Sequence, residues 1–244
     1  MNKAVPLLAL RAFQEARRGG GGLRPLAVGG ARELVPLLAK ELRAGGEPGA
    51  VREGFGPGAA ALVWLGTADE DVLRAAARAR VPIVGVTEGE GLPYVLDTNL
   101  VRVAPGHGLP VAAIAAALAR ALGMRGVGLA ARLPVLRRPV ADELTRLAAR
   151  RNALLAAAVW LPGVDLPVLT LNQIRLLFGI AGAGGRAPGP ELLPELAGVA
   201  GAAYGFRQLA RTLERLPVPA ALVRAGVAFA GTVAVGAALR RRLG

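Results

Sequence analysis

Residues 60–86 decide the fold, and they read AALVWLGTADEDVLRAAARARVPIVGV. Two short apolar runs, Ala60–Leu65 and Val81–Val86, flank the segment Thr67–Arg78, whose apolar residues have helical spacing. Short apolar runs of this kind are typical of buried parallel strands. A strand, a helix and a second strand in succession imply a right-handed crossover, and therefore a parallel sheet covered by helices.

The same alternation extends outward in both directions. Within the central helix, Thr67 and Glu70 have the spacing of a capping box, so Thr67 is the expected N-cap. Further strands and helices are predicted, in chain order, at Leu23–Val28, Ala31–Arg43, Leu100–Val103 and Leu109–Leu122. We therefore expect residues 23–133 to form a three-layer α/β domain of the Rossmann-like or GTPase-like kind, with a parallel sheet.

Beyond residue 133 the pattern changes to long Ala/Leu-rich stretches. Pro and Gly separate four candidate helices: Pro139–Trp160, Leu166–Ala183, Leu192–Leu216 and Val218–Arg242. Residues 1–133 carry 16 basic and 11 acidic groups, net +5, whereas residues 134–244 carry 14 and 6, net +8. The more helical part is also the more basic. We expect an α/β domain followed by an all-α domain, an Ala/Gly-rich bundle over residues 134–244.

The first 22 residues predict a short amphipathic helix and a glycine linker, Gly19–Gly22. Apolar residues at helical spacing lie at Val5, Leu8, Ala9, Ala12 and Ala16. A signal peptide is the alternative interpretation. Arg11 interrupts its short apolar run, so export through this segment is not expected.

The composition excludes much familiar enzyme chemistry. The 244 residues include no cysteine, no serine and a single histidine, His107. Disulfides, thiolate sites, histidine metal pairs and serine triads are therefore impossible. Residues 69–71 form an acidic cluster, but acidic residues at a helix start complement the helix dipole without any ligand. We expect no catalytic residues, no metal and no cofactor.

The formal net charge is +13, and only two of the 30 basic residues are lysines. The bias toward Arg, Ala, Gly, Pro and Leu is typical of a GC-rich coding sequence. Such a charge still attracts anionic lipid or polymer. Nucleic acid is not an expected partner, because aromatic residues make up only 4% and no basic stripe is present.

The turn after the first strand is the place to search for a phosphate site. It reads Val28-Gly29-Gly30-Ala31-Arg32 and lacks the Lys and Ser/Thr of a phosphate-binding loop. Gly29, Gly30 and Arg32 remain candidates for an anion site at the start of the next helix. The alternative is a tight strand-to-helix turn. Later strand ends lead into Thr87-Glu88-Gly89 and into residues 104–110, which contain His107.

The most distinctive stretch of the helical part is WLPGVDLPVLTLNQIRLLFGIAG, residues 160–182. This stretch, which includes Gln173-Ile174-Arg175, resembles the bacterial domain-of-unknown-function 697 family. The later run Gly231–Gly236 adds to the resemblance. The resemblance covers residues 137–243. It implies a helical module of the kind that follows GTPase domains and occurs in membrane-associated proteins.

The resemblance further implies that the amino-terminal half is similar to a GTPase domain in its order of elements. Thr87-Glu88-Gly89 then corresponds to the guanine-reading Asn-Lys-x-Asp motif, and Ala104-Pro105-Gly106 to the last base-contacting loop. The phosphate-loop Lys and the magnesium-binding hydroxyl are missing, and no Asp is placed to read guanine. Both missing groups stabilise phosphoryl transfer, so a degenerate, non-catalytic relative is expected.

Two segments bear on membrane association. Residues 218–239 contain Arg224 as their only charge and precede Arg240-Arg241-Arg242, whereas residues 153–171 are broken at Pro162-Gly163. Membrane-embedded hairpins and a soluble or peripheral bundle are both open interpretations. For embedded hairpins, the positive-inside rule places Arg240–Arg242 and the arginine-rich segment Arg137–Arg151 in the cytoplasm.

The expected function is a non-catalytic adaptor or scaffold at the cytoplasmic face of the inner membrane, with a protein partner or a second copy of itself. A cytoplasmic location is the alternative. One alternative function is a nucleotide or anion sensor, or an enzyme, that uses the strand-end loops. The other is a basic scaffold that binds an anionic polymer.

Overall fold

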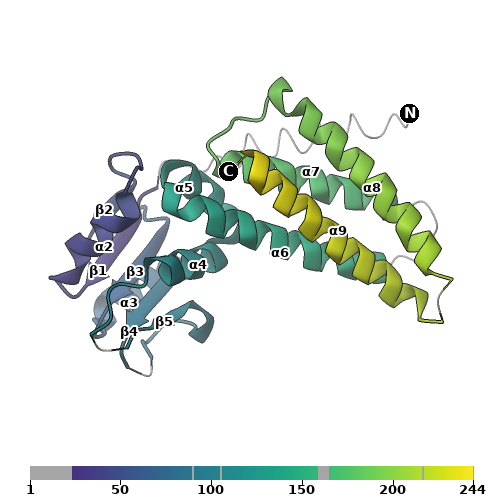
Figure 1. Cartoon of the computed structure of the whole chain (residues 1–244). Helices are drawn as coiled ribbons and strands as arrows, with labels where there is room; N and C mark the ends of the chain where they lie inside the picture. The colour runs from purple at the N-terminus through teal and green to yellow at the C-terminus, as the bar shows by residue number, and fades with distance from the viewer. Residues whose placement is uncertain (1–23, 90, 105, 159–164, 216, 244) are drawn as a thin grey trace. The chain divides into compact units, whose positions relative to one another are not determined.

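The computed structural model describes residues 24–89, 91–104, 106–158, 165–215 and 217–243 (Figure 1). The chain divides into two compact units, and the division falls between Val140 and Ala141. The first is an α/β unit and the second is helical, so the expected succession of an α/β fold and an all-α fold is confirmed. The expected amphipathic helix and linker of residues 1–22 lie outside the described residues.

The α/β unit is built on a five-stranded, all-parallel sheet. Its strands lie in the order β2-β1-β3-β4-β5. Their bounds are β1 Leu26–Gly30, β2 Val51–Glu53, β3 Ala61–Leu65, β4 Ile83–Thr87 and β5 Leu100–Arg102. The chain moves from β1 outward to β2, then returns to β3 on the other side of β1. The winding direction therefore reverses between β1 and β3.

Helices cover both faces of this sheet. The helices of the unit are α2 Leu34–Arg43, α3 Glu70–Arg78, α4 Val111–Leu122 and α5 Val127–Arg132. On one face, Leu62 and Trp64 of β3 pack with Leu73 and Ala76 of α3. Helix α2 contacts β1 and β2, α4 contacts β4 and β5, and α2 and α4 contact each other. Since side chains alternate along a strand, the two faces bury alternate residues of β3, all five of which are buried.

The structure corrects two details of this unit. Strand β2 was not expected from the sequence, because it is a three-residue edge strand in which only Val51 is buried. The N-cap of α3 is Asp69, not Thr67: the Asp69 side chain accepts a hydrogen bond from the Val72 amide at 3.2 Å. The Thr67 carbonyl accepts a hydrogen bond from Trp64 Nε1 at 2.8 Å, which ties Thr67 to the preceding turn.

The helical unit contains most of α6 Pro134–Ala158, together with α7 Asp165–Ala183, α8 Leu193–Leu213 and α9 Ala220–Leu243. All four expected helices are present. Helix α6 begins earlier than expected and contains Pro139. Helices α7, α8 and α9 contact one another, and Asn152 of α6 bonds to both α7 and α9.

The division between the units falls inside α6, whereas the sequence placed the domain boundary between residues 133 and 134. Residues 160–164, which open the stretch resembling the 697 family, lie outside the described residues. Three short 3-10 segments complete the described elements: Asp97–Asn99, Gly123–Gly126 and Pro190–Leu192.

Candidate functional site

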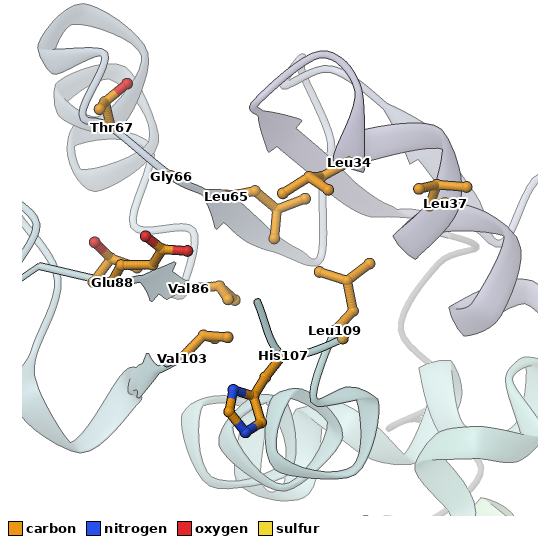
Figure 2. A pocket seen from close by; sticks show the side chains of 12 residues that line it. Leu34, Leu37, Leu65, Gly66, Thr67, Val86, Glu88, Val103, His107 and Leu109 are labelled. Atoms are coloured by element: carbon orange, nitrogen blue, oxygen red, sulfur yellow. The ribbon is translucent and has the colours of Figure 1, made fainter. Parts of the chain in front are cut away.

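A pocket of about 440 Å³ lies at the carboxyl edge of the sheet (Figure 2). Parallel α/β sheets bind ligands at this edge, near the point where the winding reverses. Its walls come from the start of α2, the ends of β3 and β4, and the loop before α4. The lining residues are Leu34, Leu37, Leu65, Gly66, Thr67, Val86, Thr87, Glu88, Val103, His107, Gly108 and Leu109.

The structure brings two separately expected loops together in this pocket. Thr87 ends β4 and Glu88 follows it, and His107 lies in the loop after β5. Thr87 is buried, and its Oγ1 accepts a hydrogen bond from the Gly89 amide at 3.0 Å. Glu88 and His107 are exposed at the mouth. Of residues 104–106 in the same loop, Pro105 lies outside the described residues.

The candidate anion residues Gly29, Gly30 and Arg32 are not among the residues that line the pocket. A Cβ on Gly29 would lie 2.9 Å from the Trp64 ring. Gly30 has a φ of +109°, and a Cβ there would lie 2.0 Å from the Leu65 carbonyl oxygen. Both glycines are therefore required by close packing of β1 on β3, and Arg32 is exposed.

The backbone amides at three strand ends are occupied by neighbouring strands. The Ala31 amide donates to the Leu65 carbonyl at 2.9 Å, and the Gly66 amide donates to the Val86 carbonyl at 2.8 Å. The Val103 amide donates to the Thr87 carbonyl at 3.0 Å. A phosphate-binding loop presents its amides to the ligand. Here these three donors hold the sheet together.

The acidic cluster at the start of α3 has partners within its own helix. Asp69 caps the helix, and Arg74 pairs with Glu70 at 2.7 Å and Asp71 at 3.2 Å. Hydrogen bonding to the Tyr94 hydroxyl, and secondly to Glu70, raises the pKa of Arg74 above its usual value. Within the described ranges, no group of three His, Asp or Glu side chains has the arrangement of a metal site.

The helical unit buries a set of polar side chains beside its apolar core. Seven of the eight buried polar side chains in the described parts of the chain belong to it. The seven are Glu143, Thr145, Asn152, Thr170, Asn172, Gln173 and Thr232. Asn152 donates to Thr232 Oγ1, and Asn172 donates to Asn152 Oδ1, each over 2.9 Å. Hydrogen bonds between side chains therefore join α6, α7 and α9.

The same unit carries large apolar side chains on its outside. Ten of the fifteen exposed large apolar residues in the described ranges belong to it. They are Leu147, Leu154, Val168, Leu193, Tyr204, Leu209, Val218, Leu222, Phe229 and Val233. On α9, the buried residues are Gly231, Thr232, Val235, Gly236, Leu239 and Leu243, whereas Leu222 is 65% exposed. This helix therefore buries two glycines and a threonine beside apolar residues, and it also exposes large apolar side chains, among them Phe229 and Val233.

Two helical segments in the described ranges are long and apolar enough to cross a membrane, Val111–Arg132 and Ala220–Leu243. The first includes α4, which packs against the sheet. The second is α9, where only 28% of the most apolar window is buried and the mean hydropathy of that window is 1.8. Helix α9 is therefore the stronger candidate for contact with lipid.

Charge is distributed unevenly along the α8–α9 hairpin. At its open end, Arg242 pairs with Glu195 at 3.7 Å, and Arg240 pairs with Asp142 of α6. At the other end, the last turn of α8, the connection and the first turns of α9 carry Arg211, Arg215 and Arg224, and a single carboxylate, Glu214, lies 3.9 Å from Arg224. We call residues 209–224 the hairpin turn; its described residues combine net positive charge with the exposed side chains of Leu209, Val218 and Leu222.

Comparison with family models, curated proteins and solved structures finds no match to this chain.

Proposed function

We propose that the protein is a non-catalytic adaptor or scaffold that associates with the cytoplasmic face of the inner membrane through its helical unit. The observation that carries the proposal is the number of large apolar side chains that this unit exposes, together with the hydrogen-bonded polar side chains that it buries between helices. A bundle surrounded by water buries apolar side chains and exposes polar ones. A bundle in contact with lipid packs its helices through small residues and hydrogen bonds between helices.

Helix α9 supports this proposal residue by residue. Gly236 faces Thr145 of α6, and Thr232 bonds to Asn152 of the same helix. Phe229 and Val233 of the same helix are exposed. In lipid, exposed Phe and Val side chains are favourable, and the buried hydrogen bonds remain satisfied.

The hairpin turn supports an anionic surface as the partner. Interfacial segments combine exposed apolar side chains with Lys or Arg that contact lipid headgroups. Each basic residue near an anionic leaflet contributes about 1 kcal/mol. Three arginines against one glutamate leave the turn positive. Arg224 lies beside Glu214, so Leu209, Val218 and Leu222 insert while the exposed Arg211 and Arg215 reach the headgroups.

The α/β unit supports a non-catalytic role. Among the described residues that line its carboxyl-edge pocket there is no Lys or Arg. The Ala31 and Gly66 amides bond to neighbouring strands. Phosphoryl transfer depends on positive charge and free donors around the phosphates. We therefore assign the unit to binding and not to nucleotide turnover.

Vesicle flotation of the full-length protein tests the proposal. We expect the protein to float with vesicles that contain an anionic phospholipid and to bind zwitterionic vesicles more weakly. The double variant Leu222→Glu, Phe229→Glu places two carboxylates on the exposed surface of α9 and should weaken vesicle binding by at least about tenfold, or ~1.4 kcal/mol. Leu96→Glu is the matched control, because Leu96 is 69% exposed in the α/β unit.

Two results would overturn the proposal. The first is recovery of the wild-type protein entirely in the unbound fraction at low salt, with either lipid. The second is equal vesicle binding by wild type and the double variant, provided that circular dichroism shows both to be folded. Turnover of a nucleotide at an ordinary enzymatic rate would separately contradict the non-catalytic part.

A further inference from the structure

The carboxyl-edge pocket has an apolar interior. Six of its twelve lining residues are aliphatic and come from three parts of the fold: Leu34 and Leu37 from α2, Leu65 and Val86 from the strand ends, and Val103 and Leu109 from the segment between β5 and α4. Figure 2 shows Leu34, Leu65 and Leu109 directed toward the same opening. Ligand pockets are typically apolar cavities of about 300–1,000 Å³ with a few polar groups, and this pocket of about 440 Å³ fits that description.

The charge of the lining is opposite in sign to the charge of the chain. The formal net charge of the whole protein is +13. Glu88 is the only Asp, Glu, Lys or Arg among the described residues that line the pocket. A carboxylate at the mouth of an apolar pocket attracts a cation and repels an anion, and the apolar wall increases both effects because its dielectric constant is low.

The Glu88 carboxylate determines which ligand groups can lie against it. An ionised carboxylate only accepts hydrogen bonds. Among the lining residues, the Gly66 and Val103 amides donate to strand carbonyls and not to the pocket. A ligand head that lies against Glu88 must therefore donate hydrogen bonds.

From these observations we propose that the pocket binds a small, predominantly apolar molecule that carries an ammonium group. The apolar body lies among the six aliphatic side chains, and the ammonium group donates to the Glu88 carboxylate. The hydroxyl groups of Thr67 and Thr87 lie in the same lining. This site is independent of membrane association, because none of its residues belongs to the helical unit.

A matched series of three probes tests the proposal: phenylbutylamine, phenylbutanol and phenylbutyrate. They share one apolar body and differ in the charge of the head. Calorimetric titration of the full-length protein should rank the amine first, the alcohol second and the carboxylate last, with at least a tenfold difference between amine and carboxylate. Where the protein is purified in nanodiscs, empty zwitterionic nanodiscs provide the blank.

Two variants at the mouth separate charge from shape. Glu88→Gln removes the carboxylate and should reduce the affinity for the amine to that for the alcohol, with alcohol binding unchanged. Leu109→Lys introduces a cation and should make the carboxylate the preferred probe. Asp97→Asn is the control, because Asp97 is exposed in the short 3-10 segment that precedes β5, at the amino edge of the sheet. It should leave the ranking unchanged.

Three results would overturn the proposal: no saturable binding of any probe, equal binding of amine and carboxylate, or an unchanged ranking in folded Glu88→Gln. Each differs from failure of the membrane proposal, which is measured with lipid and with variants of α9.

Discussion

Asn152 on α6 donates a hydrogen bond from Nδ2 to Oγ1 of Thr232 on α9 across 2.9 Å, and both side chains are buried. Asn172 on α7 donates to Oδ1 of the same Asn152 over the same distance. The Thr232 hydroxyl in turn donates to the Ala228 carbonyl at 2.7 Å. This chain of bonds forms in only one register of the three helices, so it specifies the packing of the bundle as well as stabilising it.

Replacement of Asn152 tests the importance of this chain. In Asn152→Ala, the buried Asn172 amide and Thr232 hydroxyl lose a partner, and we expect a loss of about 1–3 kcal/mol in the free energy of unfolding. Chemical denaturation of the full-length protein measures it. Thr212→Ala is the control, because Thr212 is exposed on α8 and its hydroxyl bonds only within its own helix. Equal losses in the two variants would contradict the assignment.

Two glycines on α9 provide a matched test of helix packing. A Cβ on Gly236 would lie 2.4 Å from the Thr145 side chain, whereas a Cβ on Gly226 meets nothing within 4 Å. Gly236→Ala should therefore destabilise the protein by about 1–3 kcal/mol through overpacking. Gly226→Ala should stabilise it by up to about 1 kcal/mol, because alanine favours the helix.

A second substitution separates overpacking from other effects at Gly236. Thr145→Ala removes the two atoms that approach most closely, so the cost of Gly236→Ala should fall by more than half in that background. Thermal unfolding of the single and double variants measures the coupling. Additive costs would show that Gly236 is sensitive for a reason other than Thr145.

The sequence predicted those strands of the α/β unit whose pattern lies within a few consecutive residues. Short apolar runs marked β1, β3, β4 and β5, since buried parallel strands need continuous apolar sequence. Strand β2 has no such run, and its position depends on pairing with β1 through Leu26 and Val51. The start of α3 was misplaced because the Thr67 carbonyl bonds to Trp64, a contact that only the folded turn creates.

The candidate site was predictable only in outline. The strand-end loops that contain Thr87, Glu88 and His107 were identified because parallel strands end at one edge of a sheet. The sequence could not show that the Ala31 amide is taken by Leu65, because that bond depends on the register of β1 and β3. In the bundle, the polar residues were visible, but Asn152 and Thr232 are separated by 80 residues, and their pairing is a property of the packing.

The corrected N-cap of α3 can be verified directly. Asp69→Ala removes the acceptor of the Val72 amide and should cost about 1 kcal/mol, which is typical for loss of an N-cap. Thr67→Ala should change the free energy of unfolding by less than about 0.5 kcal/mol, because its side chain is exposed and its carbonyl is retained. Urea denaturation compares the two. A larger loss in Thr67→Ala would restore the capping box expected from the sequence.

Gly30 separates a packing role from an anion-binding role at the first strand-to-helix turn. Gly30→Ala should destabilise the protein by more than about 3 kcal/mol, since it combines a strained φ of +109° with a Cβ 2.0 Å from the Leu65 carbonyl oxygen. Gly58→Ala is the matched control: its φ is +77°, and its Cβ would meet nothing within 4 Å. Its backbone strain alone should lower the free energy of unfolding by about 1–2 kcal/mol.

Arg32→Ala, at an exposed position, should change the free energy of unfolding by no more than about 0.5 kcal/mol. Denaturation in the presence and absence of phosphate completes the test. Equal stability of the two glycine variants would contradict the packing role of Gly30. If phosphate stabilised the wild-type protein and Arg32→Ala abolished this effect, the turn would be shown to bind an anion.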